Sequence, residues 1–396
     1  MAITNKEEGV WGIDKVFAKQ NQGSIWGYTG AASAFVFGRN QKGQLGLNNK
    51  VDLSSPVQLP GAGWVNAKHR SSTSDGFMAV KTDGTLWAWG HSWGGGNMLN
   101  IPPGAVSSPT QVPGTTWSHD SRGKFTGPKT VSQAIKTDGT LWSAGYGTYG
   151  GLGLGHNGKI SSPVQIPGSW KSVSSSSYTV MGVRTNGTLW WWGKNTSGSN
   201  GNNQGQNTTF NSPKTVGSDT TWHELQGDAS TFIASKTDGS LWMWGANGSG
   251  QLGQNDKIQR SSPVQIPGTW EISANKFQCG NSTAGAINTD GELYIWGQNN
   301  WGQLGQNGPF NPTTGSISNF SSPVQIPGTW TTISLAYNAG LGVKTDGTAW
   351  VWGQNEFGGL GLNQVDANYS SPVQIPGTDW VMATKAKYGG ILFANI

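Results

Sequence analysis

The sequence has a single cysteine, few charges and no long apolar run, and each shortage excludes a class of protein. Cys279 alone cannot form an internal disulfide framework or a zinc site built on several cysteines. No apolar segment approaches the roughly 20 residues of a membrane-spanning helix. Charged and aromatic residues each make up 11% of the chain, unlike the charged, aromatic-poor composition of disordered chains. Long helices are disfavoured as well, since 62 of 396 residues are glycine, at a cost of about 1 kcal/mol per helical site.

Internal repeats determine the fold prediction. One module, Ser-Ser-Pro-Val-Gln-Ile-Pro-Gly, occurs at 161–168, 261–268, 321–328 and 370–377, with variants at 54–61, 107–114 and 211–217. A second module, Lys-Thr-Asp-Gly-Thr-Leu-Trp-x-Trp-Gly, is complete at 81–90 and has relatives that end at Gly38, Gly145, Gly193, Gly245, Gly297 and Gly353. Successive closing glycines are 52, 55, 48, 52, 52 and 56 residues apart, which indicates seven copies of one structural unit.

Each repeat predicts four short strands. Asp83-Gly84 supplies the positive-φ positions of a tight hairpin, and the period-2 alternation after it puts Trp87 and Trp89 on one face. The Ser-Ser-Pro-Val-Gln-Ile segment has a proline near its start, as an edge strand tolerates. One sheet of four strands cannot bury both of its faces, so neighbouring sheets must stack on it. Radial stacking of such sheets is the β-propeller.

The two ends of the chain supply complementary parts of one repeat. Residues 389–396 align with the strand that precedes the Asp-Gly turn, and residues 34–38 align with the strand that follows it. The sequence therefore predicts an all-β, seven-bladed β-propeller over residues 31–396, closed by a blade shared between N- and C-terminal strands, with residues 1–30 as a separate segment. Small residues recur in the strand before the turn and are assigned to an innermost strand near the axis: Ala79, Ala134, Gly182, Ala234, Ala286 and Gly342.

These motifs resemble the RCC1 repeat family, named for the regulator of chromosome condensation, over roughly residues 31–396. The resemblance implies a seven-bladed propeller with split-blade closure. Residues 91–99 of the second repeat and Gly198-Ser-Asn-Gly201 of the fourth depart from the usual Asn-x-x-Gly-Gln-Leu-Gly turn. Activity does not follow from this fold alone, because propellers host many functions.

The sequence predicts no catalytic, cofactor-binding or metal site. The five histidines have no metal-binding spacing among themselves. The aspartates before the hairpin glycines have a sufficient role in the turns, where aspartate bonds its own backbone. A net charge of +5 without a dense basic stripe argues against specific nucleic-acid binding. Membrane insertion is not expected either.

Residues 1–30 carry a short amphipathic stretch between aromatic residues, too short to be stable alone. The stretch docks either on the propeller itself or on a larger assembly. Its pattern, Gly-Val-Trp followed by a second tryptophan, resembles the N-terminal segments of structural proteins from marine tailed bacteriophages. That resemblance implies an anchoring segment that contacts other virion proteins, with the apolar residues Val10, Trp11, Ile13, Val16, Phe17, Ile25 and Trp26.

The segments between Gln-Leu-Gly and Ser-Ser-Pro vary most between repeats, and in repeat proteins such loops often form the binding face. Candidate recognition residues there and in the glycine-rich turns are Trp93, Trp301, Asn307, Phe310 and Phe320. The resulting hypothesis is a non-enzymatic virion component of a tail, fibre or capsid, present in several copies and binding a host-surface glycan or protein.

The alternatives place the protein outside a virion, for example in the cytoplasm. They are a guanine-nucleotide exchange factor or chromatin-associated propeller, as the family name implies, a sugar-binding propeller lectin, and an enzyme with a site on the central axis. The protruding β-hairpin and basic extensions that exchange and chromatin roles use in family members are not recognisable in this sequence.

Overall fold

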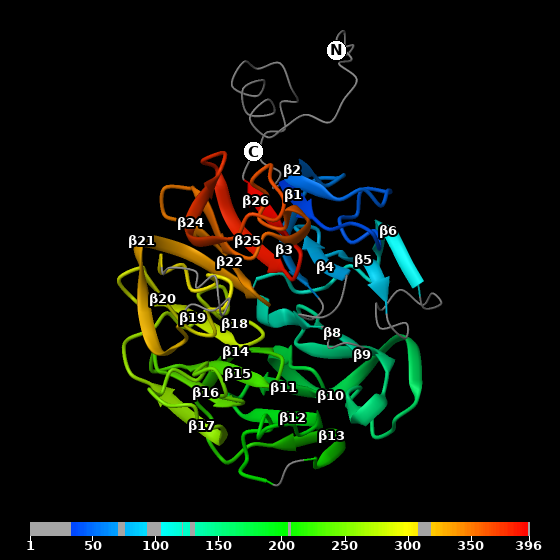
Figure 1. Ribbon diagram of the computed structural model, residues 1–396. Coiled ribbons are helices and arrows are strands. Elements are labelled where there is room, and N and C mark those ends of the chain that lie inside the picture. Colours follow the sequence, from blue (N-terminus) through cyan, green and yellow to red (C-terminus); the bar gives the residue numbers. More distant parts are fainter. Residues whose placement is uncertain are drawn as a thin grey trace.

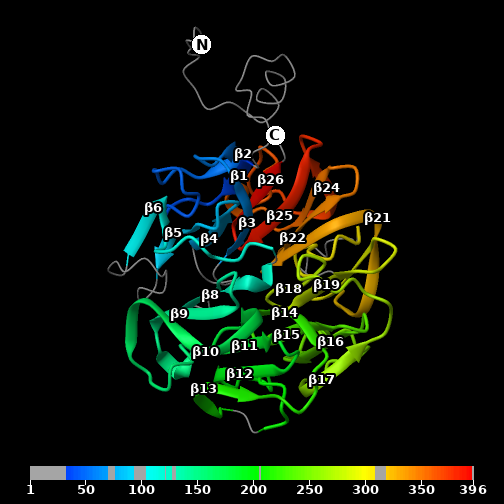
Figure 2. The same ribbon diagram turned by 180° about the vertical axis from the view of Figure 1, so that it is seen from behind.

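The protein is described by a computed structural model for residues 33–69, 76–92, 104–120, 122–126, 131–204, 207–307 and 318–394. Figures 1 and 2 show β-sheets set radially around a common axis, with the strands of each sheet following one another outward. The other elements in these ranges are 3₁₀ helices, η2 (Arg122–Lys124), η3 (Thr148–Gly150) and η4 (Glu356–Gly358). This arrangement confirms the predicted all-β propeller class.

Three sheets contain four antiparallel strands each. The first contains β2 (Leu53–Gln58), β1 (Ser33–Gly38), β26 (Gly389–Ala394) and β25 (Trp380–Ala386), in that order. The second contains β3 (Trp64–His69), β4 (Gly76–Lys81), β5 (Leu86–Ser92) and β6 (Gly104–Gln111). The third contains β14 (Trp222–Asp228), β15 (Thr231–Lys236), β16 (Leu241–Gly245) and β17 (Arg260–Ile266).

Two further sheets contain seven strands each, because one long strand in each takes part in two sets of pairings. One contains β7 (Phe125–Thr126), β8 (Val131–Ile135), β9 (Thr140–Tyr146), β10 (Lys159–Ser175), β11 (Thr179–Arg184), β12 (Leu189–Lys194) and β13 (Thr209–Thr215). The other contains β18 (Phe277–Cys279), β19 (Thr283–Ile287), β20 (Glu292–Gly297), β21 (Phe320–Ala336), β22 (Ala339–Lys344), β23 (Ala349–Gly353) and β24 (Tyr369–Ile375). The first part of β21 pairs with β20 and its last part with β22.

Strands from the two ends of the chain share one sheet, as the sequence predicted. β1 pairs with β26 in a regular antiparallel register that runs from Ser33 opposite Ala394 to Gly38 opposite Gly389. Figure 1 shows the two strands, blue and red, side by side. No hairpin connects them, so pairing alone joins the beginning of the repeat region to its end.

The Asp-Gly turns behave as the sequence indicated. Oδ1 of Asp83 accepts hydrogen bonds from the backbone N–H and the hydroxyl of Thr85, at 2.9 and 2.6 Å, and Gly84 has a φ of +75°. The bond from the Thr85 hydroxyl is the main reason that the pKa of Asp83 lies below its usual value. The same pair of bonds recurs at Asp138, Asp238 and Asp346. The turn role of these aspartates is confirmed.

Tryptophan side chains connect successive repeats through their indole N–H groups. Nε1 of Trp352 donates to the carbonyl of Gln303 at 2.8 Å, and Nε1 of Trp89 donates to the carbonyl of Gln44 at 2.9 Å. Equivalent bonds are made by Trp192, Trp244 and Trp296. Each of these rings is buried, so the indole supplies apolar packing while its polar atom stays satisfied.

Asparagine and serine join the outer parts of neighbouring repeats. The backbone N–H of Asn255 donates to the carbonyl of Ser321 at 2.7 Å, and its Oδ1 accepts from the hydroxyl of Ser322 at 3.3 Å. Asn255 has a φ of +58°, a conformation in which asparagine is enriched. The backbone bond recurs from Asn48, Asn203, Asn307 and Asn363 to Ser107, Ser261, Ser370 and Ser54. The serines of the repeated octapeptide are therefore structural.

The prediction that the strand with small residues is innermost is wrong. Ala79 lies on β4, the second strand of its sheet, and β3 is nearest the axis. The small residues make room for a tryptophan on the neighbouring inner strand. A Cβ atom on Gly182 would lie 2.7 Å from the ring of Trp170, a separation that real Cβ contacts essentially never show.

Candidate functional site

The structure describes three of the five predicted recognition residues. Trp301 is 36% exposed in its turn, whereas Asn307 has a φ of +49° and bonds Ser370 in the next repeat. Phe320 packs against the core cluster that contains Trp352. Trp93 and Phe310 lie outside the described residues, as do the predicted anchoring residues Val10, Trp11, Ile13, Val16, Phe17, Ile25 and Trp26. A recognition or anchoring role for these residues stays a prediction.

No group of three or more His, Cys, Asp or Glu that could hold a metal ion is found in the ranges that the structure covers. Burial raises the pKa of the Cys279 thiol, which keeps it protonated and a poor nucleophile. In the same ranges no helix has the length and apolar content needed to cross a membrane.

A lysine near the axis connects three inner strands. Nζ of Lys68, on β3, donates to Oε1 of Gln226 on β14 at 2.8 Å and to the hydroxyl of Ser174 on β10 at 3.2 Å. That hydroxyl also accepts the backbone N–H of Gly227 at 2.9 Å. These bonds tie the inner strands together, and Lys68 is only 8% exposed. The group is better suited to holding the structure than to binding a ligand.

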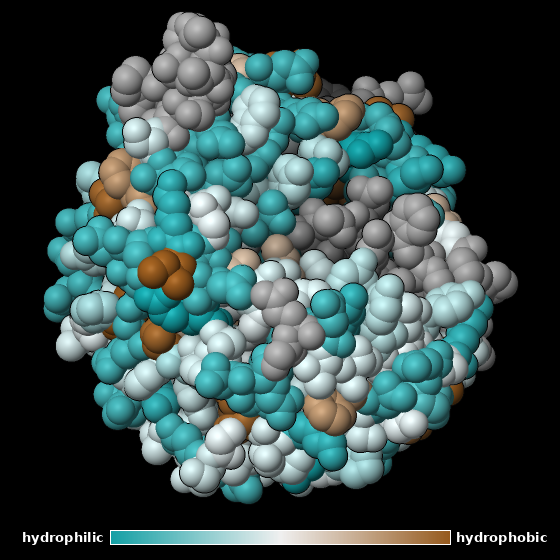
Figure 3. Space-filling view, turned by 60° about the horizontal axis from the view of Figure 1, so that its bottom comes forward, coloured by the Kyte–Doolittle hydropathy of each residue, from teal (hydrophilic) through white to brown (hydrophobic). Residues whose placement is uncertain are grey.

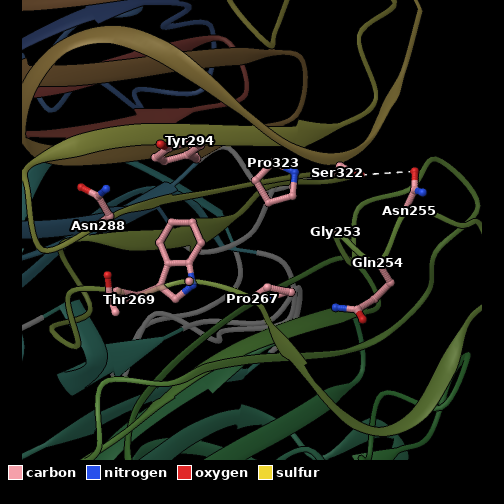
Figure 4. Close-up of a pocket in the computed structure, with 11 residues that line it drawn as sticks. Gly253, Gln254, Asn255, Pro267, Thr269, Asn288, Tyr294, Ser322 and Pro323 are labelled. Carbon is pink, nitrogen blue, oxygen red and sulfur yellow. Dashed lines mark hydrogen bonds between the residues drawn. The ribbon is translucent and has the colours of Figure 1, made fainter.

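Among the described residues, a pocket of about 500 Å³ lies between the sheet β14–β17 and the adjoining strands β18–β21. Figure 4 shows Tyr294, Asn288 and Thr269 at one end and Gln254 and Asn255 at the other, with Pro323 and Pro267 between them. The pocket is therefore a groove that runs outward along the joint between two repeats. Figure 3 shows one face of the molecule as mostly hydrophilic, with scattered hydrophobic residues rather than a broad apolar patch.

At the inner end of the groove, aromatic rings lie beside a carboxylate that is hydrogen-bonded to two of the lining residues. Trp270 and Tyr294 meet edge to face, with ring centroids 5.7 Å apart. Oε2 of Glu292 accepts hydrogen bonds from the Tyr294 hydroxyl at 3.0 Å and from Nδ2 of Asn288 at 2.8 Å. The bond to Glu292 raises the pKa of Tyr294 above its usual value, with burial and the negative charge as further causes. An aromatic, negatively charged pocket of this kind favours a cation.

Sequence reasoning did not single out Trp270, Asn288, Glu292 or Tyr294. The signal was present, because Asn288-Thr-Asp-Gly-Glu-Leu-Tyr294 departs at three positions from Lys-Thr-Asp-Gly-Thr-Leu-Trp. The fold prediction used the residues that the repeats share. The significance of the three departures depends on which side chains meet in the folded protein.

A family model described as the regulator of chromosome condensation (RCC1) repeat matches this chain at 33–79, 138–183, 238–287, 290–337 and 346–390. These ranges make up more than half of the sequence. The groove adjoins two of them, since Trp270 lies in the third and Tyr294 in the fourth.

Curated relatives match long stretches of this chain. The chain is 24% identical to the human E3 ubiquitin-protein ligase HERC2 over 354 residues, which is 85% of this chain and 7% of that protein. It is 24% identical to the ultraviolet-B receptor UVR8 of Arabidopsis thaliana over 284 residues, which is 68% of this chain and 62% of that protein. The chain thus spans a small part of HERC2 and less than two thirds of UVR8.

Solved structures share the fold. Yeast RCC1 (Prp20), crystallised with Kap60, superposes with a TM-score of 0.79 at 16% identity and covers 100% of this chain and 94% of its own. Human WBSCR16 superposes with a TM-score of 0.74 at 18% identity, covering 92% of this chain and 99% of its own. None of the relatives reported above is named as a virion protein. They favour the RCC1-type alternative over the virion hypothesis.

Proposed function

Because the chain belongs to the regulator of chromosome condensation (RCC1) repeat family, we propose that it is a non-enzymatic, seven-bladed propeller that binds protein partners. Divided at β10 and β21, the strand pairings give seven four-stranded units, each starting from an inner strand. One unit, β25-β26-β1-β2, combines both ends of the chain. Pairing of β1 with β26 closes the ring in this proposal.

Contacts between inner strands support a closed ring of seven. β3 contacts β25 and β7, β7 contacts β10, and β10 contacts β14; β14 contacts β18, β18 contacts β21, and β21 contacts β25. Side chains reinforce this cycle at its joints. The hydroxyl of Thr384 on β25 donates to the carbonyl of Ala67 on β3 at 2.8 Å, and the hydroxyl of Ser334 on β21 accepts the N–H of Lys385 at 2.8 Å. A closed ring leaves few free strand edges for unwanted pairing.

The groove at the joint of β14–β17 with β18–β21 is the observation that carries the binding role. It is open and elongated, and it is lined by backbone-rich segments at Gly253–Asn255 and Pro267–Trp270. Such a groove suits an extended segment of another protein, whose backbone and alternate side chains would both find partners. The named roles of the relatives, a receptor and a ligase, and a structure with Kap60 bound are consistent with surfaces that engage other proteins.

A photo-crosslinking amino acid placed in the groove tests the proposal. Thr269 is exposed and lines the groove, whereas Val51 is 63% exposed in the unit that contains β1 and β2. With an extract of the source cells, a crosslinker at Thr269 should attach a defined partner protein that the crosslinker at Val51 does not attach. Absence of any crosslinked protein at Thr269, or the same products at both positions, would contradict a binding role for the groove.

Guanine-nucleotide exchange is a second candidate, favoured by the superposition with yeast RCC1 over the full chain. A related structure is described with its binding properties to Gsp1p and histones. The test is release of fluorescently labelled GDP from small GTPases with and without this protein. Faster GDP release would support exchange. Unchanged GDP release from all the small GTPases of the source cells would contradict exchange and leave only the proposal of partner binding.

A further inference from the structure

In five repeats, a basic side chain lies against two aromatic rings of its own repeat. Nζ of Lys344 lies 5.0 Å from the ring centroid of Trp330 and 4.2 Å from that of Trp350. Antiparallel pairing sets this geometry, because Lys344 is opposite Trp330 in the register of β21 and β22. The same arrangement is made by Lys81, Lys136, Arg184 and Lys236. Each of these cations is attracted to the ring faces.

The repeat that forms the groove keeps the rings and lacks the cation. Asn288 is opposite Trp270, where five of the other repeats have lysine or arginine and the repeat of β25 and β26 has Ala394. The Trp270 and Tyr294 centroids are 5.7 Å apart at 88°, close to the 6.2 Å and 73° of Trp222 and Trp242. Over the described part of the chain, no lysine or arginine lies over either ring of the groove pair.

The asparagine side chain is held in the turn and away from the position of the missing cation. Its Oδ1 accepts the backbone N–H groups of Asp290 and Glu292 at 3.0 and 2.8 Å. Its Nδ2 donates to Oε2 of Glu292. A shorter side chain fixed by three hydrogen bonds leaves the space over Trp270 to the groove, which both residues line.

A carboxylate accompanies this substitution. Glu292 occupies the position of Thr85, Thr140, Thr188, Ser240 and Thr348 in the other repeats, whose hydroxyls accept the indole N–H of the second ring. The hydrogen-bond partners of the Glu292 carboxylate are the neutral Asn288 and Tyr294. Within the described ranges, the ion pairs do not include Glu292. This repeat has therefore exchanged an internal cation for a negative charge beside an open aromatic pair.

We propose that the pocket lined by Trp270, Asn288 and Tyr294, with Glu292 hydrogen-bonded to the last two, binds a cationic side chain, lysine or arginine, presented by a partner protein. This inference rests on the proposed protein-binding function and names the chemistry of one contact. The partner's cation would take the position that Lys344 holds in the next repeat, and its flexible stem would enter from the groove. Glu292 would neutralise its charge, while Trp270 and Tyr294 would contact it through their rings.

Ligand-observed saturation-transfer NMR on the full chain tests this pocket with three peptides: Gly-Gly-Lys-Gly-Gly, its arginine counterpart, and a counterpart with norleucine, which has the lysine stem without the charge. The two basic peptides should bind about tenfold more tightly than the norleucine peptide, as a desolvated cation–π contact supplemented by a carboxylate implies. Free lysine and a polyamine form two further arms. If free lysine or the polyamine binds as tightly as the basic peptides, the site takes small cations. That result would overturn the assignment to a partner protein.

Three variants make the test specific. Asn288→Lys supplies the internal cation of the other repeats and should reduce peptide affinity at least tenfold. Glu292→Gln keeps the shape, removes the charge and should weaken binding about fivefold. Val51→Ala, at an exposed residue outside the pocket, should change nothing. Unchanged binding by Asn288→Lys overturns the proposal; if that variant fails to fold, unchanged binding by Glu292→Gln does so.

The neighbouring repeat offers a gain of function. The triple variant Lys344→Asn, Thr348→Glu, Trp350→Tyr reproduces the groove's residues and should double the number of peptide sites per chain. The experiments distinguish failure of the cation site from failure of the proposed protein-binding function. Peptide binding without any partner crosslinked at Thr269 would leave the cation site and remove the partner role, and a partner still crosslinked in Asn288→Lys would show that the partner does not use this pocket.

Discussion

A fully buried lysine couples folding to pH. Lys385 on β25 is 0% exposed, and Nζ donates to the carbonyls of Ala386 and Gly389 at 2.8 and 3.0 Å. Burial lowers the pKa of Lys385 to about 7, from 10.5. The unfolded chain therefore binds more protons than the folded protein between these values, so the free energy of unfolding should increase as the pH rises through this window.

Replacement of Lys385 by methionine isolates this effect. Between pH 7 and 10 the free energy of unfolding of the natural protein should rise relative to Lys385→Met by up to ~1.4 kcal/mol per pH unit. Urea unfolding followed by circular dichroism at several pH values measures the difference. Parallel pH profiles for the two proteins would show that the lysine keeps its ordinary pKa when buried.

Roles confined to a few neighbouring residues were predictable, and roles that cross between repeats were not. The turn role of Asp83, which bonds Thr85, was predictable, since a turn is encoded by four consecutive residues. The burial of Lys385 has no local signature, because β21, whose Ser334 hydroxyl accepts the Lys385 N–H, comes next to it only in the folded chain. Asn288 shows the same limit, since its effect depends on the ring of Trp270 across a strand pair.

Two glycines at equivalent hairpin turns allow the effect of backbone strain to be distinguished from the effect of contact with the next unit. Gly187 and Gly239 occupy equivalent turns with φ of +80° and +86°. A Cβ atom at Gly187 would lie 1.9 Å from the carbonyl of Thr220, which precedes β14, whereas at Gly239 the nearest atom is 3.9 Å away. The first glycine is required by packing and by conformation, and the second by conformation alone.

The two alanine variants should therefore differ. Gly239→Ala should cost about 1 kcal/mol through the positive φ alone. Gly187→Ala carries the same strain and must also displace the segment before β14, so its cost should exceed 2 kcal/mol. Denaturant unfolding of both variants under identical conditions provides the comparison. Equal losses of stability would show that the turn moves freely against its neighbour.

For the strands, the sequence predicted the hairpins and the edge strands correctly. It assigned the wrong strand of each sheet to the position nearest the axis. Alternation and Asp-Gly turns describe a strand's neighbours along the chain, which is why β4 and β5 were identified. The recurrence of small residues in one strand was attributed to crowding at the axis, whereas Gly182 and Gly342 accommodate the tryptophan of the adjacent strand. Comparison of the repeats could not reveal this contact. Every repeat that has the small residue also has the tryptophan, so the two never vary together.

The whole molecule depends on its last strand. β26 contributes the fully buried side chains of Ile391, Leu392 and Phe393, each of which stabilises the fold by roughly 1.5–3 kcal/mol. Their sum is comparable with the 5–15 kcal/mol by which a typical domain is stable. Removing residues 387–396 should therefore abolish cooperative folding. A sharp thermal transition and native circular dichroism in the truncated chain would contradict the proposed role of β26 in closing the ring.

Removal of residues 1–30 is the matched deletion at the other end and also tests the predicted anchor. The shortened chain should keep the melting temperature of the full chain within a few degrees, since β1 begins at Ser33. If the virion hypothesis holds, it should fail to enter particles while remaining folded. Loss of folding in this variant would instead show that the segment docks on the propeller itself.

The register of β1 against β26 also determines how the molecule resists mechanical force. Ser33 and Ala394 lie opposite each other at one end of the antiparallel pair, so tension applied through the two chain ends acts on a single hydrogen-bonded step at a time. Such a geometry unzips at low load, whereas pulling along the strand direction would shear all the bonds at once. Stretched by its termini, this protein should open first at that seam, with the remaining sheets yielding afterwards from either side.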